Sequence, residues 1–257
     1  MKESTADFIA YCREIGVRHM TLVTPLLMQP GGLEQAQHAL TTPDPHVAVV
    51  NHPLAMGSDL ERAGAEEIAK LREAIDIAAA LGARAIYLVS GGRGSLDWEG
   101  AAARFAELIA PCLKPAEENG VRLLVETASD FNADIHIAHT LDDTVRLAEI
   151  AGIGVCIDFH PIWFEADLKG KFARAVPLAG LVQVSDYVAG DRTAPCRAVP
   201  GDGMIPLERL IGDVLDAGYK GVFDLELVGP RIEQEGPRAA GKRAAENLSE
   251  ILEKLGA

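Results

Sequence analysis

Residues 121–158 read VRLLVETASDFNADIHIAHTLDDTVRLAEIAGIGVCID, and this segment is the most informative about the fold. Two apolar runs rich in Val, Leu and Ile, 121–126 and 153–158, flank a segment at 141–150 whose apolar residues recur at helical spacing. Runs that are apolar at nearly every position are typical of strands buried on both faces, as in a parallel sheet with helical crossovers. The stretch therefore predicts one β-α-β unit.

The same unit repeats along the chain. Five further apolar runs resemble strands, at 17–24, 46–51, 84–90, 180–187 and 221–227. Helix-like segments lie between or beside them, at about 6–15, 59–81, 98–119, 206–217 and 239–255. A period of roughly 30–40 residues per unit suits a doubly wound sheet or an eight-stranded barrel. The glycine turn at 91–94 lacks the G-x-G-x-x-G spacing of a dinucleotide-binding sheet, so we expect a single (β/α)8 TIM barrel over residues 1–257.

The number of strands is one short of a closed barrel. Only seven strand-like runs occur, and the chain opens on a helix-like segment. We therefore expect that a regular first strand is missing, or that residues 1–5 form a rudimentary substitute for it. A normal eighth strand near the N-terminus would contradict this expectation.

Composition and charge exclude several classes of partner. The chain has 24 Lys and Arg against 38 Asp and Glu, a formal net charge of −14, which argues against binding to nucleic acid or to anionic membranes. No apolar run approaches the roughly 20 residues of a membrane span, and the N-terminus lacks a signal-peptide core, so we expect a cytoplasmic protein. Four cysteines far apart in sequence predict reduced thiols: Cys12, Cys112, Cys156 and Cys196.

Oxygen-bearing side chains stand at the ends of the last four strands: Glu126, Asp158, Gln183 and Glu226. In a β/α barrel these ends converge on the active-site mouth. Any one acid is equally well explained as a helix cap or as an arginine partner, but four equivalent positions favour a shared site. Carboxylates among Val, Leu and Ile need a neutralising charge. An oxygen shell predicts one divalent cation, Mg²⁺ or Mn²⁺ first, with Co²⁺ or Zn²⁺ as alternatives.

The motifs VRLLVE, GVCIDFH, LVQVSDY, PGDG-x-IPLERL and GYKGVFDLEL occur in this order over the second half of the chain. Together they resemble the xylose isomerase-like barrel superfamily of sugar phosphate isomerases and epimerases. The resemblance implies that Glu126, Asp158, Gln183 and Glu226 hold one divalent metal. It also implies that Glu126 and Glu226 are the catalytic residues, that the substrate is a small carbohydrate-like molecule and, by analogy, that the protein is a homo-oligomer.

Two departures from the epimerase pattern keep other functions open. Gln183 stands where epimerases often carry His, and Gln at this position is similar to some dehydratase branches. In addition, His160 follows Asp158 by two residues instead of three. We therefore expect first an isomerase or epimerase that removes a proton next to a metal-bound carbonyl through an enediolate, and second an inosose- or dehydroshikimate-type dehydratase. A third alternative is a non-catalytic sugar- or partner-binding barrel, which predicts no metal and Arg197 or Arg231 paired to the acids. The superfamily's trinuclear zinc endonuclease needs more His ligands than these motifs hold.

Five polar or aromatic residues near the presumed mouth are candidates for substrate binding: His52, His160, Trp163, Arg197 and Arg231. Each also has an ordinary structural explanation, which is a hydrogen-bonded histidine, a core tryptophan or a surface ion pair.

Four further polar residues have weaker assignments. Asp186 orients the loop after the Gln183 strand, and Arg93 could meet an anion. His136 and His139 are interpreted as surface loop residues.

Overall fold

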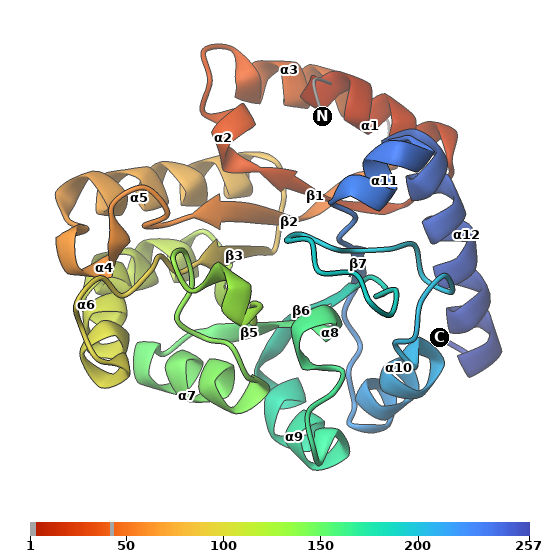
Figure 1. The fold of residues 1–257 in the computed structure, drawn as a ribbon. Helices are drawn as coiled ribbons and strands as arrows, with labels where there is room; N and C mark the ends of the chain where they lie inside the picture. Colours follow the sequence, from red (N-terminus) through yellow and green to blue (C-terminus); the bar gives the residue numbers. More distant parts are fainter. Residues whose placement is uncertain (1–3, 42–43) are drawn as a thin grey trace.

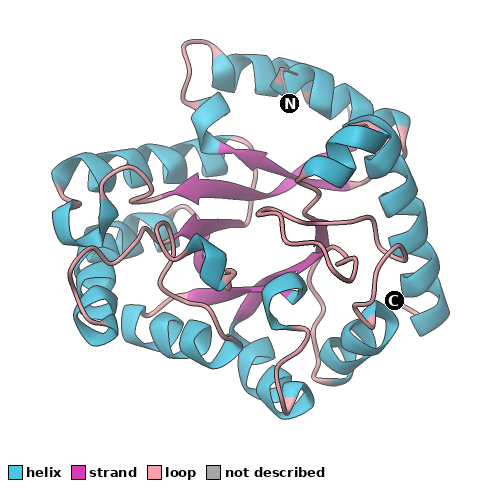
Figure 2. Cartoon of the chain, viewed as in Figure 1, coloured by secondary structure: helices cyan, strands magenta, loops and turns pink. Residues whose placement is uncertain are grey.

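The computed structural model describes residues 4–41 and 44–257. In these residues, seven parallel strands form one sheet whose spatial order follows the sequence. They are β1 (His19–Val23), β2 (His46–Pro53), β3 (Ala85–Val89), β4 (Arg122–Glu126), β5 (Gly154–Asp158), β6 (Ala179–Val184) and β7 (Phe223–Leu225). The sheet curls into a nearly closed barrel with the helices outside it (Figure 1; Figure 2). The TIM-barrel fold class is confirmed.

The outer layer consists of helices that connect successive strands. The longer ones are α1 (Thr5–Glu14), α3 (Gly32–Ala39), α5 (Ala65–Ala80), α6 (Trp98–Glu118), α7 (Leu141–Ala151), α9 (Leu168–Ala175), α10 (Leu207–Asp216) and α12 (Pro237–Leu255). Short turns of helix are α2 (Thr24–Leu27), α4 (Asp59–Arg62), α8 (Phe159–Ile162) and α11 (Pro230–Glu235), with 3₁₀ turns η1 (Asp130–Asn132) and η2 (Val176–Leu178). Among the described residues, no helix is both long and apolar enough to cross a membrane.

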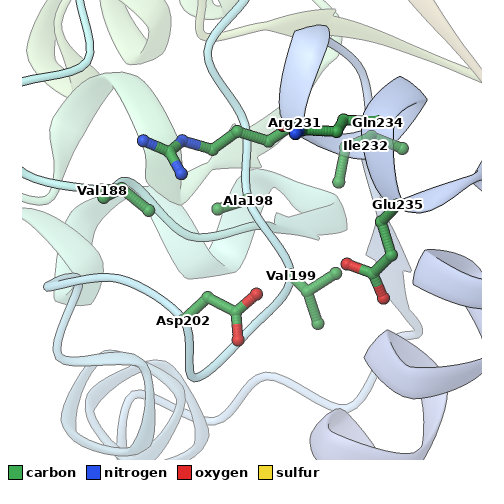
Figure 3. Close-up of a pocket in the computed structure, with 8 residues that line it drawn as sticks. All are labelled: Val188, Ala198, Val199, Asp202, Arg231, Ile232, Gln234 and Glu235. Atoms are coloured by element: carbon green, nitrogen blue, oxygen red, sulfur yellow. The ribbon is translucent and has the colours of Figure 1, made fainter.

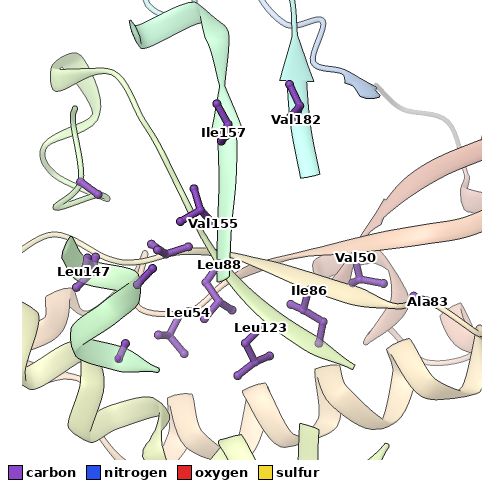
Figure 4. Close-up of a cluster of buried hydrophobic side chains, with 14 of the residues drawn as sticks. Val50, Leu54, Ala83, Ile86, Leu88, Leu123, Leu147, Val155, Ile157 and Val182 are labelled. Carbon is purple, nitrogen blue, oxygen red and sulfur yellow. The ribbon is translucent and has the colours of Figure 1, made fainter. Parts of the chain in front are cut away.

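The two faces of the sheet have separate apolar clusters. Side chains that alternate along the strands pack outward against the helices, among them Val50, Ile86, Leu88, Leu123, Val155 and Val182 (Figure 4). The barrel interior holds a smaller cluster of Val49, Ala85, Tyr87, Leu124, Cys156 and Leu181. Burial on both faces is why the strands are apolar at nearly every position. All four cysteines are buried and free, which confirms the prediction that the chain has no disulfide framework.

The barrel is nearly closed and has no eighth strand in the part of the chain that is described. α1 begins at Thr5, and Ser4 caps it by accepting a hydrogen bond from the Asp7 backbone N–H. The end strands β1 and β7 are joined from inside by the Thr21 hydroxyl, which donates to Asp224 Oδ1 at 2.8 Å. The expected absence of a regular first strand therefore holds for these residues. The suggested substitute strand lies partly in residues 1–3, outside the described residues.

Several predicted boundaries were wrong. The helix predicted at 59–81 is divided into α4 and α5, because Ala63 has an extended ψ of 144°. Gly64 is the N-cap of α5, and its backbone N–H donates to the Glu67 side chain. The strand predicted at 180–187 ends at Val184, and the one predicted at 221–227 is reduced to Phe223–Leu225. Both strands stop early because their last residues turn into the loops that form the barrel mouth.

Candidate metal centre and active site

The four predicted ligands point into the barrel. Glu126, Asp158 and Gln183 each follow a member of the inner cluster by two residues, so alternation places them on the same inward face. The strand register places Glu226 on the same inward face. Gln183 pairs with Asp224 on β7, and Glu226 comes two residues after Asp224. The Glu226 backbone N–H donates to Val184 O at 3.2 Å, which fixes Glu226 at the end of the ladder.

Three carboxylates meet at the mouth. One oxygen from each of Glu126, Asp158 and Glu226 lies within 4.8 Å of the other two. Glu126 and Asp158 are buried, at 6% and 1% exposure, and the Glu226 side chain is 29% exposed. These three acids can offer oxygen ligands to one hard cation.

Burial and repulsion between the acids raise the pKa values of the two glutamates. Burial, with repulsion from Glu226 and Asp158, raises the pKa of Glu126 well above its ordinary value. Burial also raises the pKa of Glu226 to about 7, although Arg197 acts to lower it. The cluster is therefore stabilised by uptake of a proton or of a cation.

Gln183 is fully buried beside the acids, but its oxygen is turned away from them. Its Oε1 accepts a hydrogen bond from the Cys156 thiol at 3.1 Å. Its Nε2 forms no hydrogen bond within residues 4–41 and 44–257, although it lies near enough to Glu126 and Asp224 to lower the pKa of both carboxyl groups. Rotation of the amide would exchange its oxygen and nitrogen. The role of Gln183 as a fourth ligand stays a prediction.

Arg197 is an ion-pair partner of the acids. Its Nη2 lies 2.6 Å from Asp158 Oδ2 and 2.8 Å from Glu226 Oε2. Its Nη1 donates to Asp158 Oδ1 at 3.1 Å and to the Ser185 hydroxyl at 2.9 Å. The pairing is one that the non-catalytic alternative anticipated. When all three carboxylates are ionised, one guanidinium compensates one of them and leaves two negative charges, which one divalent cation would neutralise.

Asp186 holds the loop that carries Arg197. Its carboxylate accepts hydrogen bonds from four backbone N–H groups at 2.8–3.0 Å, those of Tyr187, Gly201, Gly203 and Ile205. A Cβ at Gly203 would lie 2.3 Å from Asp186 Oδ1, so only glycine fits this turn. The structure therefore places Asp186 where it orients the loop, as predicted.

His52 lies on the outer face of the sheet. It pairs in register with Leu88, which packs outward, and its Nδ1 is 2.8 Å from the Thr24 hydroxyl. Burial lowers the pKa of His52 to about 4. None of these contacts reaches the acids, and a substrate-binding role for His52 stays a prediction.

His160 and Trp163 lie beside the loop after β6. The ring centroid of Tyr187 is 6.0 Å from that of His160 and 6.3 Å from that of Trp163. The His160 Nε2 is also 3.8 Å from Cys196 Sγ. His160 therefore lies beside the residue that precedes Arg197. Contact with a substrate remains a prediction for both His160 and Trp163.

Arg231 is placed apart from the carboxylates. Its Nε donates to Asp191 Oδ2 at 2.9 Å, and the side chain is 47% exposed. It lines a pocket of about 440 Å³ between the β6–α10 loop and α11 (Figure 3). Its predicted contact with substrate therefore has no support from proximity to the acids.

His136 is the site residue that the sequence interpretation missed. We expected it at the surface, and this was wrong: it is 4% exposed, and its Nε2 lies 3.6 Å from Glu126 Oε2. Burial, with the nearby His139, lowers the pKa of His136 to about 3. Asp224 was also missed, although alternation with Glu226 could have revealed that both face inward.

Comparison with known proteins agrees with this architecture. A family model described as a xylose isomerase-like TIM barrel matches residues 9–254. Among curated proteins, a fructoselysine 3-epimerase of Escherichia coli O157:H7 is 23% identical over 157 residues, which is 58% of this chain and 53% of that protein. The chain thus spans about half the length of the curated relatives it matches.

Solved structures share the fold over nearly the whole chain. The IOLI protein with a bound zinc atom superposes with a TM-score of 0.82 at 16% identity, covering 98% of this chain and 94% of that one. D-psicose 3-epimerase with D-tagatose from Clostridium cellulolyticum H10 gives a TM-score of 0.79 at 16% identity, covering 99% and 94%. At these identities the likeness establishes the fold alone.

Proposed function

The chain belongs to the xylose isomerase-like TIM barrel family, and on this basis we propose that it is a divalent-metal-dependent isomerase or epimerase. Its substrate is a sugar or sugar-like hydroxy-ketone, which reacts through an enediolate. The observation that carries the proposal is the meeting of Glu126, Asp158 and Glu226 at the carboxyl ends of the strands, where β/α-barrel enzymes have their active sites. Zinc in one solved neighbour and tagatose in another support the metal and the substrate class.

The donor set fits a hard divalent cation. The three acids would hold it, with Gln183 as a fourth ligand after rotation of its amide. When all three acids are ionised, Arg197 leaves two negative charges uncompensated, which favours uptake of a divalent cation. When bound, such a cation would polarise the substrate carbonyl and acidify the neighbouring C–H bond.

Proton transfer falls to the two glutamates. Glu126 ends β4 and Glu226 follows β7, three places further along the strand order, so they can approach a bound substrate from different sides. One carboxylate removes the proton, and the other returns it on the opposite face or assists departure of a hydroxyl. Return of the proton gives isomerisation or epimerisation, and loss of the hydroxyl gives dehydration.

The test separates these outcomes in one assay series. Ketoses, inososes and cyclic keto-acids are incubated with Mn²⁺ in D₂O, and solvent deuterium in the recovered or isomerised sugar supports the proposal. An absorbing enone product would instead identify a dehydratase. Glu126→Gln and Glu226→Gln are the site variants, and Glu149→Gln, an exposed acid on α7, is the matched control. Full activity in either site variant would refute the assignment.

A further inference from the structure

We propose that His136 is a positioning residue for Glu126: its Nε2–H holds Glu126 Oε2 and leaves the other carboxylate oxygen for the reaction. The inference rests on the proposed function, because it assigns a task to the Glu126 carboxylate. His136 lies in the segment between β4 and α7 and comes from neither a strand nor a helix.

The segment around His136 is held rigidly at the mouth. The Ile135 carbonyl accepts a hydrogen bond from Gly91 N at 2.8 Å, and the Ile137 N–H donates to the Ser90 hydroxyl at 3.1 Å. The Trp98 indole donates to Ile137 O at 2.8 Å. The residues on both sides of His136 are therefore fixed to the end of β3 and to α6, which leaves the imidazole little freedom to move away from Glu126.

Close approach of the backbone reinforces this placement. A Cβ at Gly92 would lie 2.2 Å from the Asp134 carbonyl oxygen, so the turn after β3 and the His136 segment can pack together only with glycine there. Further along, the Ala128 N–H donates to Ala138 O at 3.0 Å and closes the segment on its other side. Several contacts of this segment therefore place His136 beside Glu126.

The imidazole has no competing structural partner. Its Nδ1 is buried and forms no hydrogen bond among the described residues, while its Nε2 lies 3.6 Å from Glu126 Oε2. Catalytic hydrogen bonds are often long before substrate binds and tighten in the reacting complex. A buried histidine whose Nε2 lies beside a carboxylate matches the arrangement in which outer partners orient metal ligands.

The contact makes the two glutamates different. Glu226 is paired with the permanent cation Arg197, whereas Glu126 lies beside an imidazole, which carries no permanent charge. An imidazole N–H can orient a carboxylate without the fixed positive charge of a guanidinium. His136 therefore approaches the site from the Glu126 side.

The test combines a spectroscopic and a binding measurement on the full chain. Long-range ¹⁵N–¹H NMR of ¹⁵N-histidine-labelled protein should show His136 as the neutral Nε2–H tautomer, with an Nε2 resonance that moves in Glu126→Gln. Co²⁺ titration should show about tenfold weaker binding in His136→Ala and near-normal binding in His136→Gln, which keeps an N–H donor. His139→Ala is the matched control, because His139 lies in the same segment and its Nδ1 is 3.2 Å from Ala128 O, whereas His136 is the histidine beside Glu126.

Each contrary result is decisive. An Nδ1–H tautomer, or an Nε2 resonance insensitive to Glu126→Gln, would overturn the proposal even if His136→Ala does not fold. Equal losses of Co²⁺ affinity in His136→Ala and His139→Ala would show a general effect of the segment and would also overturn it. Failure of the unmodified protein to bind Co²⁺ would count against the proposed metal site instead, and the NMR measurement would still decide the His136–Glu126 contact.

Discussion

Arg197→Met is the substitution whose consequences follow most directly from the charges in the barrel mouth. It removes the guanidinium from Asp158 and Glu226 and leaves three clustered carboxylates without a compensating charge. Breaking a buried ion pair by removing one partner costs about 3–5 kcal/mol. Because the Glu226 side chain is 29% exposed, we expect a loss near the lower end, about 3 kcal/mol at pH 8.

Thermal unfolding in the presence of a chelator measures this loss. For a chain of this length, about 3 kcal/mol corresponds to a fall in Tm of roughly 6–12 °C. The loss should shrink at pH 5, where the glutamates take up protons, and it should shrink on addition of Mn²⁺, because a divalent cation replaces the missing positive charge. The variant should also bind Mn²⁺ more tightly than the unmodified protein, since its site carries one more negative charge.

The matched control is Arg62→Met, which removes an exposed arginine from an ion pair with Asp59. Exposed pairs contribute about 0–1 kcal/mol, so this variant should unfold within a few degrees of the unmodified protein. Equal Tm values for Arg197→Met and the unmodified protein at pH 8 would refute the charge argument. A fall in the Tm of Arg197→Met that Mn²⁺ does not reduce would also refute the charge argument.

Three further predictions concern protons, the loop and turnover. The folded-state pKa of Glu226 is about 7, above its ordinary value of 4.5, so between these pH values the folded protein binds a proton that the unfolded chain releases. The Tm of chelator-treated protein should therefore fall by the equivalent of about 3 kcal/mol between pH 4.5 and 7. A Tm that rises over this range would contradict the prediction. Asp186→Ala removes the acceptor of four backbone N–H groups and should cost about 3 kcal/mol in urea unfolding; a loss below 1 kcal/mol would show that the loop does not depend on it. Glu126→Gln and Glu226→Gln should each lower kcat by roughly 10²–10⁴-fold, with Glu149→Gln unchanged in the same D₂O assay.

The positions at the strand ends are the part of the candidate site whose placement can be predicted from the sequence. Parallel strands buried on both faces are recognisable as apolar runs, and a polar residue at the end of each run stands out against them. Inward placement of Glu126, Asp158 and Gln183 follows from simple alternation, because each lies two residues after Leu124, Cys156 or Leu181. Local sequence is sufficient here because the strand geometry is local.

His136 and Arg197 could not be placed in the same way. His136 reaches Glu126 because its segment is fixed by Ser90, Gly91 and Trp98, which lie about 40 residues earlier in the chain. Arg197 reaches Asp158, 39 residues away, through a loop held by Asp186. Loop conformations that depend on such distant contacts leave no periodic pattern in the sequence, so polar loop residues are hard to distinguish from surface residues.

Isothermal titration of chelator-treated protein with Mn²⁺ is the decisive experiment for the metal site. We predict one divalent cation per chain, a rise in Tm as Mn²⁺ is added, and loss of both effects in Asp158→Asn, because Asp158 is the most deeply buried of the three acids. Absence of binding, together with a Tm that does not respond to Mn²⁺, would contradict the metal site and favour a non-catalytic barrel whose acids are held by Arg197 alone.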